Sequence, residues 1–135
     1  MFVDASAMVA ILAGEPEAAA FTEALDRAET RITSPIAVFE TVLGLTRLRH
    51  ATVDEAEADV TEFLRLADIA CVPITPQDTH SALLAFARYG KGRGHPAQLN
   101  LGDCFAYAVA RSHDVALLFK GNDFSQTDVT PAAGV

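Results

Sequence analysis

The chain has 135 residues, half of which are hydrophobic, a net charge of −8 at pH 7 and an isoelectric point near 4.8. This length predicts a single domain, residues 1–135, with enough apolar residues for a packed core. The acidic balance excludes nucleic-acid binding through a generally basic surface, and no apolar run reaches the roughly 20 residues of a membrane-spanning helix.

The N-terminal segment predicts the first unit of an α/β domain. Phe2–Val3 forms a short strand that ends at Asp4, and residues 5–12 follow as a helix that Gly14 ends. No basic leader precedes the strand, so we expect a cytoplasmic protein without a signal peptide. Asp4 then lies at the carboxyl end of a strand, where open parallel sheets bind ligands. It belongs either to such a site, supported by a hydrogen bond from Ser6, or only to the N-cap of the helix.

The next 70 residues predict alternating helices and strands, as in a domain built on a parallel sheet. The expected helices are 17–28, 36–49, 52–67 and one that begins at Pro76, and the expected strands are 31–33 and 69–74.

One of these helices carries an acid within an apolar face. Ser34 and Pro35 begin the helix 36–49 as its N-cap and first helical residue. Its stripe is formed by Ile36, Phe39, Leu43 and Arg47. Glu40 stands in that stripe, where a carboxylate is the less expected residue. Three interpretations are open: the side chain extends to solvent, pairs with an arginine or points into an acidic site.

The segment around residue 90 concentrates positive charge in an acidic chain. Arg88, Lys91 and Arg93 place three of the ten basic residues within six positions. Glycines alternate with Lys91, Arg93 and His95, which predicts a loop. It is either an ordinary solvated loop or a site that holds a phosphate backbone.

The run GHPAQLNLGDCFAYAVAR starts as this loop and becomes a helix with Asp103 in its first turn. Asp103 heads the same helix face as Ala106, Tyr107 and Ala110. A carboxylate on such a face is costly unless it binds something positive, which indicates a site. The helix dipole alone also favours an aspartate in the first turn, so both interpretations are open.

Residues 115–119 form a continuous apolar run, which predicts a buried parallel strand. KGNDFSQTD follows, so Asp123 lies just past the carboxyl end of this strand, and Asp128 is a second candidate acid. The other reactive residue types show no site pattern. Cys71 and Cys104 are expected to be buried free thiols, and no HExxH, CxxC or P-loop motif is present.

Four carboxylates are therefore expected near one edge of the sheet. Asp4 and Asp123 lie at strand ends, and Glu40 and Asp103 lie on helices that begin near that edge. Unpaired acids this close repel one another, and a divalent cation relieves the repulsion. Oxygen ligands suit Mg²⁺ or Mn²⁺, which activate water and stabilise charge on an attacked phosphate. Alternatively, the acids are caps and solvated charges of an ordinary α/β domain.

Four segments resemble PIN-domain ribonucleases and, more narrowly, the VapC toxins of bacterial toxin–antitoxin pairs. They are FVDASAMVAIL, the helix with Glu40, GHPAQLNLGDCFAYAVAR and LLFKGNDFSQTDV, and they cover nearly the whole chain. The resemblance implies a three-layer α/β/α PIN-like domain around a central parallel sheet. It also implies metal-dependent hydrolysis of RNA phosphodiester bonds by a toxin that a cognate VapB-type antitoxin neutralises, and a homodimer.

The resemblance also assigns roles to the acids. It implies that Asp4 and Asp103 are the main Mg²⁺ ligands, with Mn²⁺ as an alternative ion, and that Glu40 completes the acidic site. Ser6 matches the hydroxyl residue that supports the first aspartate. Many relatives carry two aspartates where this chain has Asn122 and Asp123. We take Asp123 as the fourth catalytic acid, with Asp128 in reserve.

Substrate contacts are expected from the basic loop. Lys91, Arg93 and His95 are candidates to guide an RNA backbone into the acidic site, and a loop of tRNA or rRNA is the candidate substrate.

Two other hypotheses remain. A phosphohydrolase of the haloacid dehalogenase type would need an aspartate at the position of Ser6. A catalytically weakened PIN module would bind RNA or antitoxin without cleaving, with Asn122 as its sign.

Overall fold

A computed structural model describes residues 1–132 and shows a parallel sheet of four short strands in the order β3-β2-β1-β4. The strands are β1 (Phe2–Val3), β2 (Ile32–Thr33), β3 (Ala70–Cys71) and β4 (Leu117–Leu118). Phe2 is paired with Ile32 on one side and with Leu117 on the other, so β1 lies inside the sheet. The Thr33 hydroxyl donates to the Val3 carbonyl oxygen at 2.8 Å and ties these two strands further.

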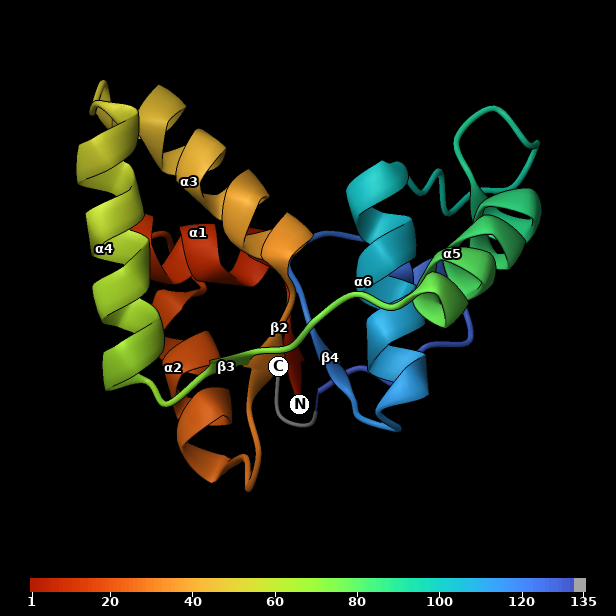
Figure 1. The fold of residues 1–135 in the computed structure, drawn as a ribbon, viewed down its shortest axis with the longest axis horizontal. Coiled ribbons are helices and arrows are strands. Elements are labelled where there is room, and N and C mark those ends of the chain that lie inside the picture. Colours follow the sequence, from red (N-terminus) through yellow and green to blue (C-terminus); the bar gives the residue numbers. More distant parts are fainter. Residues whose placement is uncertain (133–135) are drawn as a thin grey trace.

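Helices cover both faces of the sheet. They are α1 (Ala5–Ala13), α2 (Ala18–Arg27), α3 (Pro35–Arg49), α4 (Val53–Leu66), α5 (Pro76–Tyr89) and α6 (Leu101–Ser112), followed by the 3₁₀ turn η1 (Phe124–Gln126). α1 to α4 lie on one side, and α5 and α6 lie on the other (Figure 1). The predicted three-layer α/β/α architecture is confirmed. No helix within residues 1–132 combines the length and the apolar character needed to cross a bilayer.

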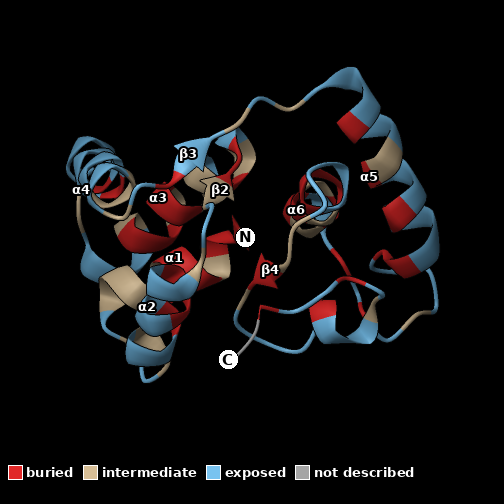
Figure 2. Ribbon diagram, turned by 90° about the horizontal axis from the view of Figure 1, so that it is seen from below, coloured by how far each residue is buried: buried red, intermediate tan, exposed pale blue. Residues whose placement is uncertain are grey.

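The core is centred on the strands and on the helices that touch them. Phe2, Val3 and Leu117 are fully buried, and small residues of α1 and α6 pack against them. In Figure 2 the buried residues gather on β4, on α6 and on the inner side of α1. Burial of this apolar surface is the main stabilising contribution to the fold. It holds the carboxyl ends of β1 and β4 in fixed positions.

Helix starts follow the expected capping chemistry. Ser34 Oγ accepts the Ala37 N–H at 3.2 Å, and Pro35 occupies the first turn of α3, as predicted. Gly14 ends α1 in the left-handed conformation with φ of 68°, which favours glycine because a Cβ is strained there. The start of α3 and the end of α1 depend on neighbouring residues only, so the sequence alone could predict them.

Two expectations about burial are wrong. Phe39 is 64 % exposed, because α3 packs on α1 and α4 through a different face, whose buried residues are Ala37, Thr41, Val42, Gly44 and Leu45. Cys71 is an exposed free thiol and only Cys104 is buried. The strand expected over 69–74 is limited to Ala70–Cys71, which lies at the sheet edge and is exposed on both residues.

Candidate active site

Asp4 occupies the carboxyl end of β1 and caps α1. Its Oδ2 accepts the Ser6 N–H at 3.1 Å and the Ser6 hydroxyl at 2.5 Å. The residue is only 4 % exposed, and burial raises the pKa of its carboxyl despite these hydrogen bonds. Asp4 therefore caps α1, and its buried carboxyl also lies at the strand end where the sequence predicts a site.

Ser6 also connects two strand ends. Its hydroxyl oxygen accepts the Lys120 N–H at 3.0 Å, while the Asp4 N–H donates to the Leu118 carbonyl at 3.0 Å. The Lys120 ammonium group turns away to Glu15 and to Glu17, the latter at 3.3 Å. Its charge is therefore shared with acids of the α1–α2 connection and is not paired with Asp4.

Glu40 reaches from α3 to the first turn of α6. The side chain is half-buried and its carboxylate lies over Gly102, where a Cβ would come within 2.2–2.4 Å of the carboxylate atoms. Burial, followed by the charges of Asp4 and Asp103, raises the pKa of Glu40 to about 7. Of the three interpretations of Glu40, the structure supports an acidic cluster.

Asp103 lies in the first turn of α6 and takes part in a reciprocal cap. Its Oδ2 accepts the Asn100 N–H at 3.1 Å, and Asn100 Oδ1 accepts the Asp103 N–H at 2.9 Å. The pKa of Asp103 is raised to about 6 by burial, while the Asn100 N–H lowers it and the charges of Asp4 and Asp123 raise it. The same residue is thus a capping group and a member of the acidic cluster.

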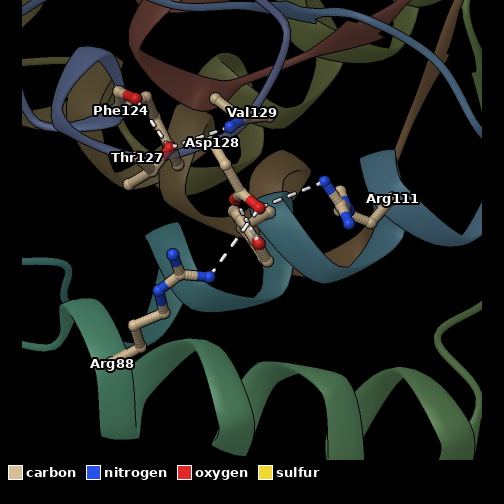
Figure 3. A network of polar contacts seen from close by, with 7 residues as sticks. Arg88, Arg111, Phe124, Thr127, Asp128 and Val129 are labelled. Atoms are coloured by element: carbon tan, nitrogen blue, oxygen red, sulfur yellow. Dashed lines mark hydrogen bonds and ion pairs between the residues drawn. The ribbon is translucent and has the colours of Figure 1, made fainter.

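The candidates for the fourth acid lie in different surroundings. Asp123 is exposed, precedes η1 and makes no side-chain cap bond, and its charge reaches Asp103. Asn122 is exposed and its carbonyl oxygen accepts the Ser125 hydroxyl at 2.6 Å. Asp128 is bound elsewhere, by the Tyr107 hydroxyl at 2.6 Å and Arg111 at 3.4 Å (Figure 3). Asp123 is therefore the candidate whose charge acts on Asp103, whereas Asp128 is held by Tyr107 and Arg111.

The basic loop leads directly into α6. Lys91 and Arg93 are exposed, and Gly92 and Gly94 have φ of 81° and 78°, in the left-handed region that glycine adopts without strain. His95 is half-buried: its Nδ1 accepts the Ala97 N–H at 3.1 Å, and its ring meets Tyr89 edge-on at 4.9 Å. His95 shapes the loop, a role that the sequence did not indicate.

A groove extends from the acids between α1, α3 and the β4 end. Its lining includes Ser6, Glu40, Arg47 and Lys120, and it encloses a volume of ≈ 540 Å³. The sequence alone does not indicate a site role for Arg47, because this residue lies in the stripe of Ile36, Phe39 and Leu43. Of the four site acids only Glu40 lines this groove, together with Arg47 and with Lys120, whose ammonium group is paired with Glu15 and Glu17.

The donor set fits a hard divalent cation by its chemistry. Within residues 1–132, none of Asp4, Glu40, Asp103 and Asp123 forms an ion pair, and three of them have raised pKa values. Over the same residues, no three Asp, Glu, His or Cys side chains converge into a metal-binding group. Because the four carboxylates have no ion-pair partner among the described residues, their negative charge is not balanced by this part of the protein. Their oxygen atoms are the ligand type that Mg²⁺ and Mn²⁺ prefer.

The acidic cluster predicts a pH-dependent stability of the protein in EDTA. Folding raises the pKa of Glu40 from 4.5 to about 7 and that of Asp103 from 3.8 to about 6. The folded protein therefore binds more protons than the unfolded chain between about pH 4 and pH 7, and the free energy of unfolding falls as pH rises through this window. Melting temperatures at pH 5 and pH 8 in EDTA measure this fall, which Glu40→Gln should reduce. A flat profile would contradict the prediction.

Comparison with known proteins gives consistent matches over the chain. The PIN domain family matches residues 1–129. A VapC ribonuclease of Rhizobium meliloti is 44 % identical over 95 % of this chain and 98 % of its own length. Ribonuclease VapC28 of Mycobacterium tuberculosis is 39 % identical over 98 % of this chain and 97 % of its own.

Two solved structures share the fold. The crystal structure of Mycobacterium tuberculosis VapC20, described as a sarcin–ricin loop cleaving toxin, aligns with a TM-score of 0.75 and 17 % identity, over 96 % of this chain and 95 % of that chain. A toxin–antitoxin complex from Klebsiella pneumoniae aligns with a TM-score of 0.66 and 18 % identity, over 92 % and 89 %. At these identities the structural matches show the fold alone.

Proposed function

The chain belongs to the PIN domain family and to its VapC ribonucleases, and we propose that it is a toxin that hydrolyses RNA with a divalent cation. In this proposal residues 1–135 form one catalytic domain whose site consists of Asp4, Glu40, Asp103 and Asp123. The observation that carries the proposal is the acidic cluster itself. Burial and the charges of neighbouring acids raise the pKa of Glu40 and of Asp103, and no cation of the described chain is paired with any of the four carboxylates.

Asp4, Asp103 and Glu40 divide two tasks in the proposed site, metal binding and orientation of the attacking water. Asp4 and Asp103 would hold Mg²⁺ or Mn²⁺, which when bound supplies Lewis-acid stabilisation of charge on the attacked phosphate and an acidified water. Ser6 fixes the Asp4 carboxylate through two hydrogen bonds. Glu40, whose pKa is about 7, is able to hold or release a proton near neutral pH and so to orient the attacking water.

The RNA backbone would be held by cations around the acids. Lys91 and Arg93 are exposed on the loop before α6, and Arg47 lines the groove beside Glu40. These side chains offset the net charge of −8 locally, where the phosphates approach. An accessible loop of tRNA or rRNA is the proposed substrate, because its bases are unstacked. Such a substrate implies action in the cytoplasm.

Cleavage of RNA by purified, antitoxin-free protein tests the proposal. A structured RNA mixture is incubated with Mg²⁺, with Mn²⁺ or with EDTA, and fragment ends are mapped. Cutting that requires the cation supports the proposal. Cutting that persists in EDTA would overturn the metal-dependent mechanism.

A second candidate function rests on Asn122. This residue lies beside Asp123 and carries no charge, so the site holds one acid fewer than two consecutive aspartates would provide. A weakened PIN module would then bind RNA or antitoxin without cleaving. Calorimetry with Mn²⁺ separates the two candidates. The binding module is expected not to bind the ion and not to cleave RNA.

We also propose a VapB-type antitoxin as partner. A solved neighbour is a toxin–antitoxin complex, and an arginine of such a partner would satisfy the unpaired carboxylates of this site.

A homodimer is the proposed assembly, supported by exposed apolar residues on α5 and α6. Leu83 and Leu84 are 62 % and 60 % exposed, and Leu83, Phe86 and Leu101 line an apolar groove between the two helices. Leu84→Asp is expected to convert the dimer to monomers in sedimentation measurements. Leu66→Asp, at a 70 % exposed position of α4 across the sheet, is the matched control and should leave the mass unchanged. A dimer that survives Leu84→Asp would place the interface elsewhere.

A further inference from the structure

One face of α6 connects the acidic cluster with a second polar network. Asp103, Tyr107 and Arg111 recur at intervals of four residues, so they share a face along the helix. Asp103 stands in the first turn, within the acidic cluster. Tyr107 and Arg111 lie one and two turns further along, where they contact the C-terminal segment.

The segment from Asp123 to Val129 carries an acid at each end. The charge of Asp123 reaches Asp103 and raises its pKa. Asp128 accepts the Tyr107 hydroxyl at 2.6 Å and lies 3.4 Å from Arg111, and Arg88 of α5 approaches it at 3.9 Å (Figure 3). The Asp128 end of the segment thus contacts two turns of α6, while at the other end Asp123 acts on the first turn of the same helix through its charge.

Hydrogen bonds and a buried aromatic ring hold the segment 123–129 in a defined conformation. The Thr127 hydroxyl donates to the Phe124 carbonyl at 2.7 Å and accepts the Val129 N–H at 3.2 Å. Phe124 is 3 % exposed and packs against Phe119, with ring centroids 5.2 Å apart. A rigid turn with a buried aromatic therefore separates Asp123 from Asp128.

The interactions of Asp128 with α6 oppose the repulsion between Asp103 and Asp123. Asp103 and Asp123 repel each other, and Asp123 makes no capping bond of its own. The hydrogen bond and ion pair of Asp128 supply attraction between the same segment and the same helix.

We infer that Asp128 is a positioning residue: its link to Tyr107 and Arg111 fixes the segment that presents Asp123 to Asp103. This inference rests on the proposed function, because it assigns Asp123 a place in the site. In this inference Thr127 and Asp128 hold the segment in place, and Asp128 is not a substitute for Asp123 in the acidic site.

Hydrogen exchange of metal-free protein tests the link without any reaction. Asp128→Ala removes the acceptor from the segment, and Tyr107→Phe removes the hydroxyl from the helix, so two variants break the same bond from opposite sides. Both are expected to speed amide exchange across residues 121–129. Asp59→Ala, which removes an exposed ion pair with Arg49 at 3.6 Å on the far side of the sheet, is the matched control. Unchanged exchange in both variants would overturn the inference.

Kinetics then separate positioning from general stability. Asp128→Ala should lower kcat about tenfold, with the KM for RNA and the melting temperature changed far less, and should weaken Mn²⁺ binding in calorimetry. In an Asp123→Asn background the same change should have almost no further effect, because coupled residues are not additive. Equal losses in both backgrounds would show that Asp128 acts independently of Asp123. A wild-type protein that fails to cleave RNA would overturn the proposed function, while the exchange experiment would still decide the link.

Discussion

Gly102→Ala is expected to lower RNA cleavage on the order of 10²-fold without unfolding the protein, the loss typical of a misplaced acid–base group. A Cβ at this position would lie 2.2–2.4 Å from the Glu40 carboxylate atoms, which is far inside contact distance. The carboxylate is the mobile end of a long side chain, so it moves aside at little cost to the fold. Alanine also favours the helix over glycine by up to about 1 kcal/mol. Activity and stability should therefore change in opposite directions.

Cleavage rates and melting temperatures of Gly102→Ala, Glu40→Gln and the double variant measure this effect. If the alanine acts by displacing Glu40, the double variant should lose no more activity than Glu40→Gln alone, because one group cannot be removed twice. Full activity of Gly102→Ala would show that the position of the Glu40 carboxylate does not matter for cleavage.

Asp4→Asn and Asp103→Asn are each expected to reduce metal-dependent cleavage by more than about 100-fold. Residues that merely support metal ligands cost 10- to 100-fold when changed, so the ligands themselves should cost more. Both substitutions keep an oxygen that accepts the local hydrogen bonds from Ser6 or Asn100. Both also remove one charge from a cluster that repels itself.

In EDTA at pH 8 these variants should consequently melt a few degrees higher than the wild type, since the lost repulsion favours the folded state. Cleavage assays and thermal melts of the same preparations test both predictions, the lower cleavage rate and the higher melting temperature. Asp59→Asn, an exposed acid outside the site, serves as the control for the loss of one charge. Retained cleavage in either variant would remove that residue from the proposed ligands.

Local signals in the sequence predicted the fold well. The Ser34–Pro35 start of α3, the glycine after α1 and the apolar run 115–119 that contains β4 act over a few residues, and the structure confirms each of them. The gathering of Asp4, Glu40, Asp103 and Asp123 was expected from the rule that ligands bind at the carboxyl edge of a parallel sheet. The charge of Asp4 acts on Glu40 and Asp103, and that of Asp123 on Asp103, while the roles of the four residues in a site stay a prediction.

Contacts between distant segments could not be predicted. Nothing near Gly102 indicates that Glu40, 62 positions earlier in the chain, needs the space above it. The pairing of Asp128 with Tyr107 likewise depends on the path of the chain after β4. The exposure of Phe39 depends on which face α3 turns to α1 and α4, and apolar periodicity alone did not decide it. The Asn100–Asp103 cap, in contrast, follows a local pattern that could have been found.

The hydrogen bond between Ser6 and Lys120 joins residues 114 positions apart, and it has a consequence for protein synthesis. A ribosome adds Asp4 119 residues before Asp123. The central strand β1 has no β4 to pair with during that interval, so the acids cannot assemble. On the proposed function, a nascent chain is therefore harmless to the ribosome and tRNAs that are making it. Translation itself delays the onset of toxicity and gives an antitoxin time to meet the chain once β4 and Asp123 have been made.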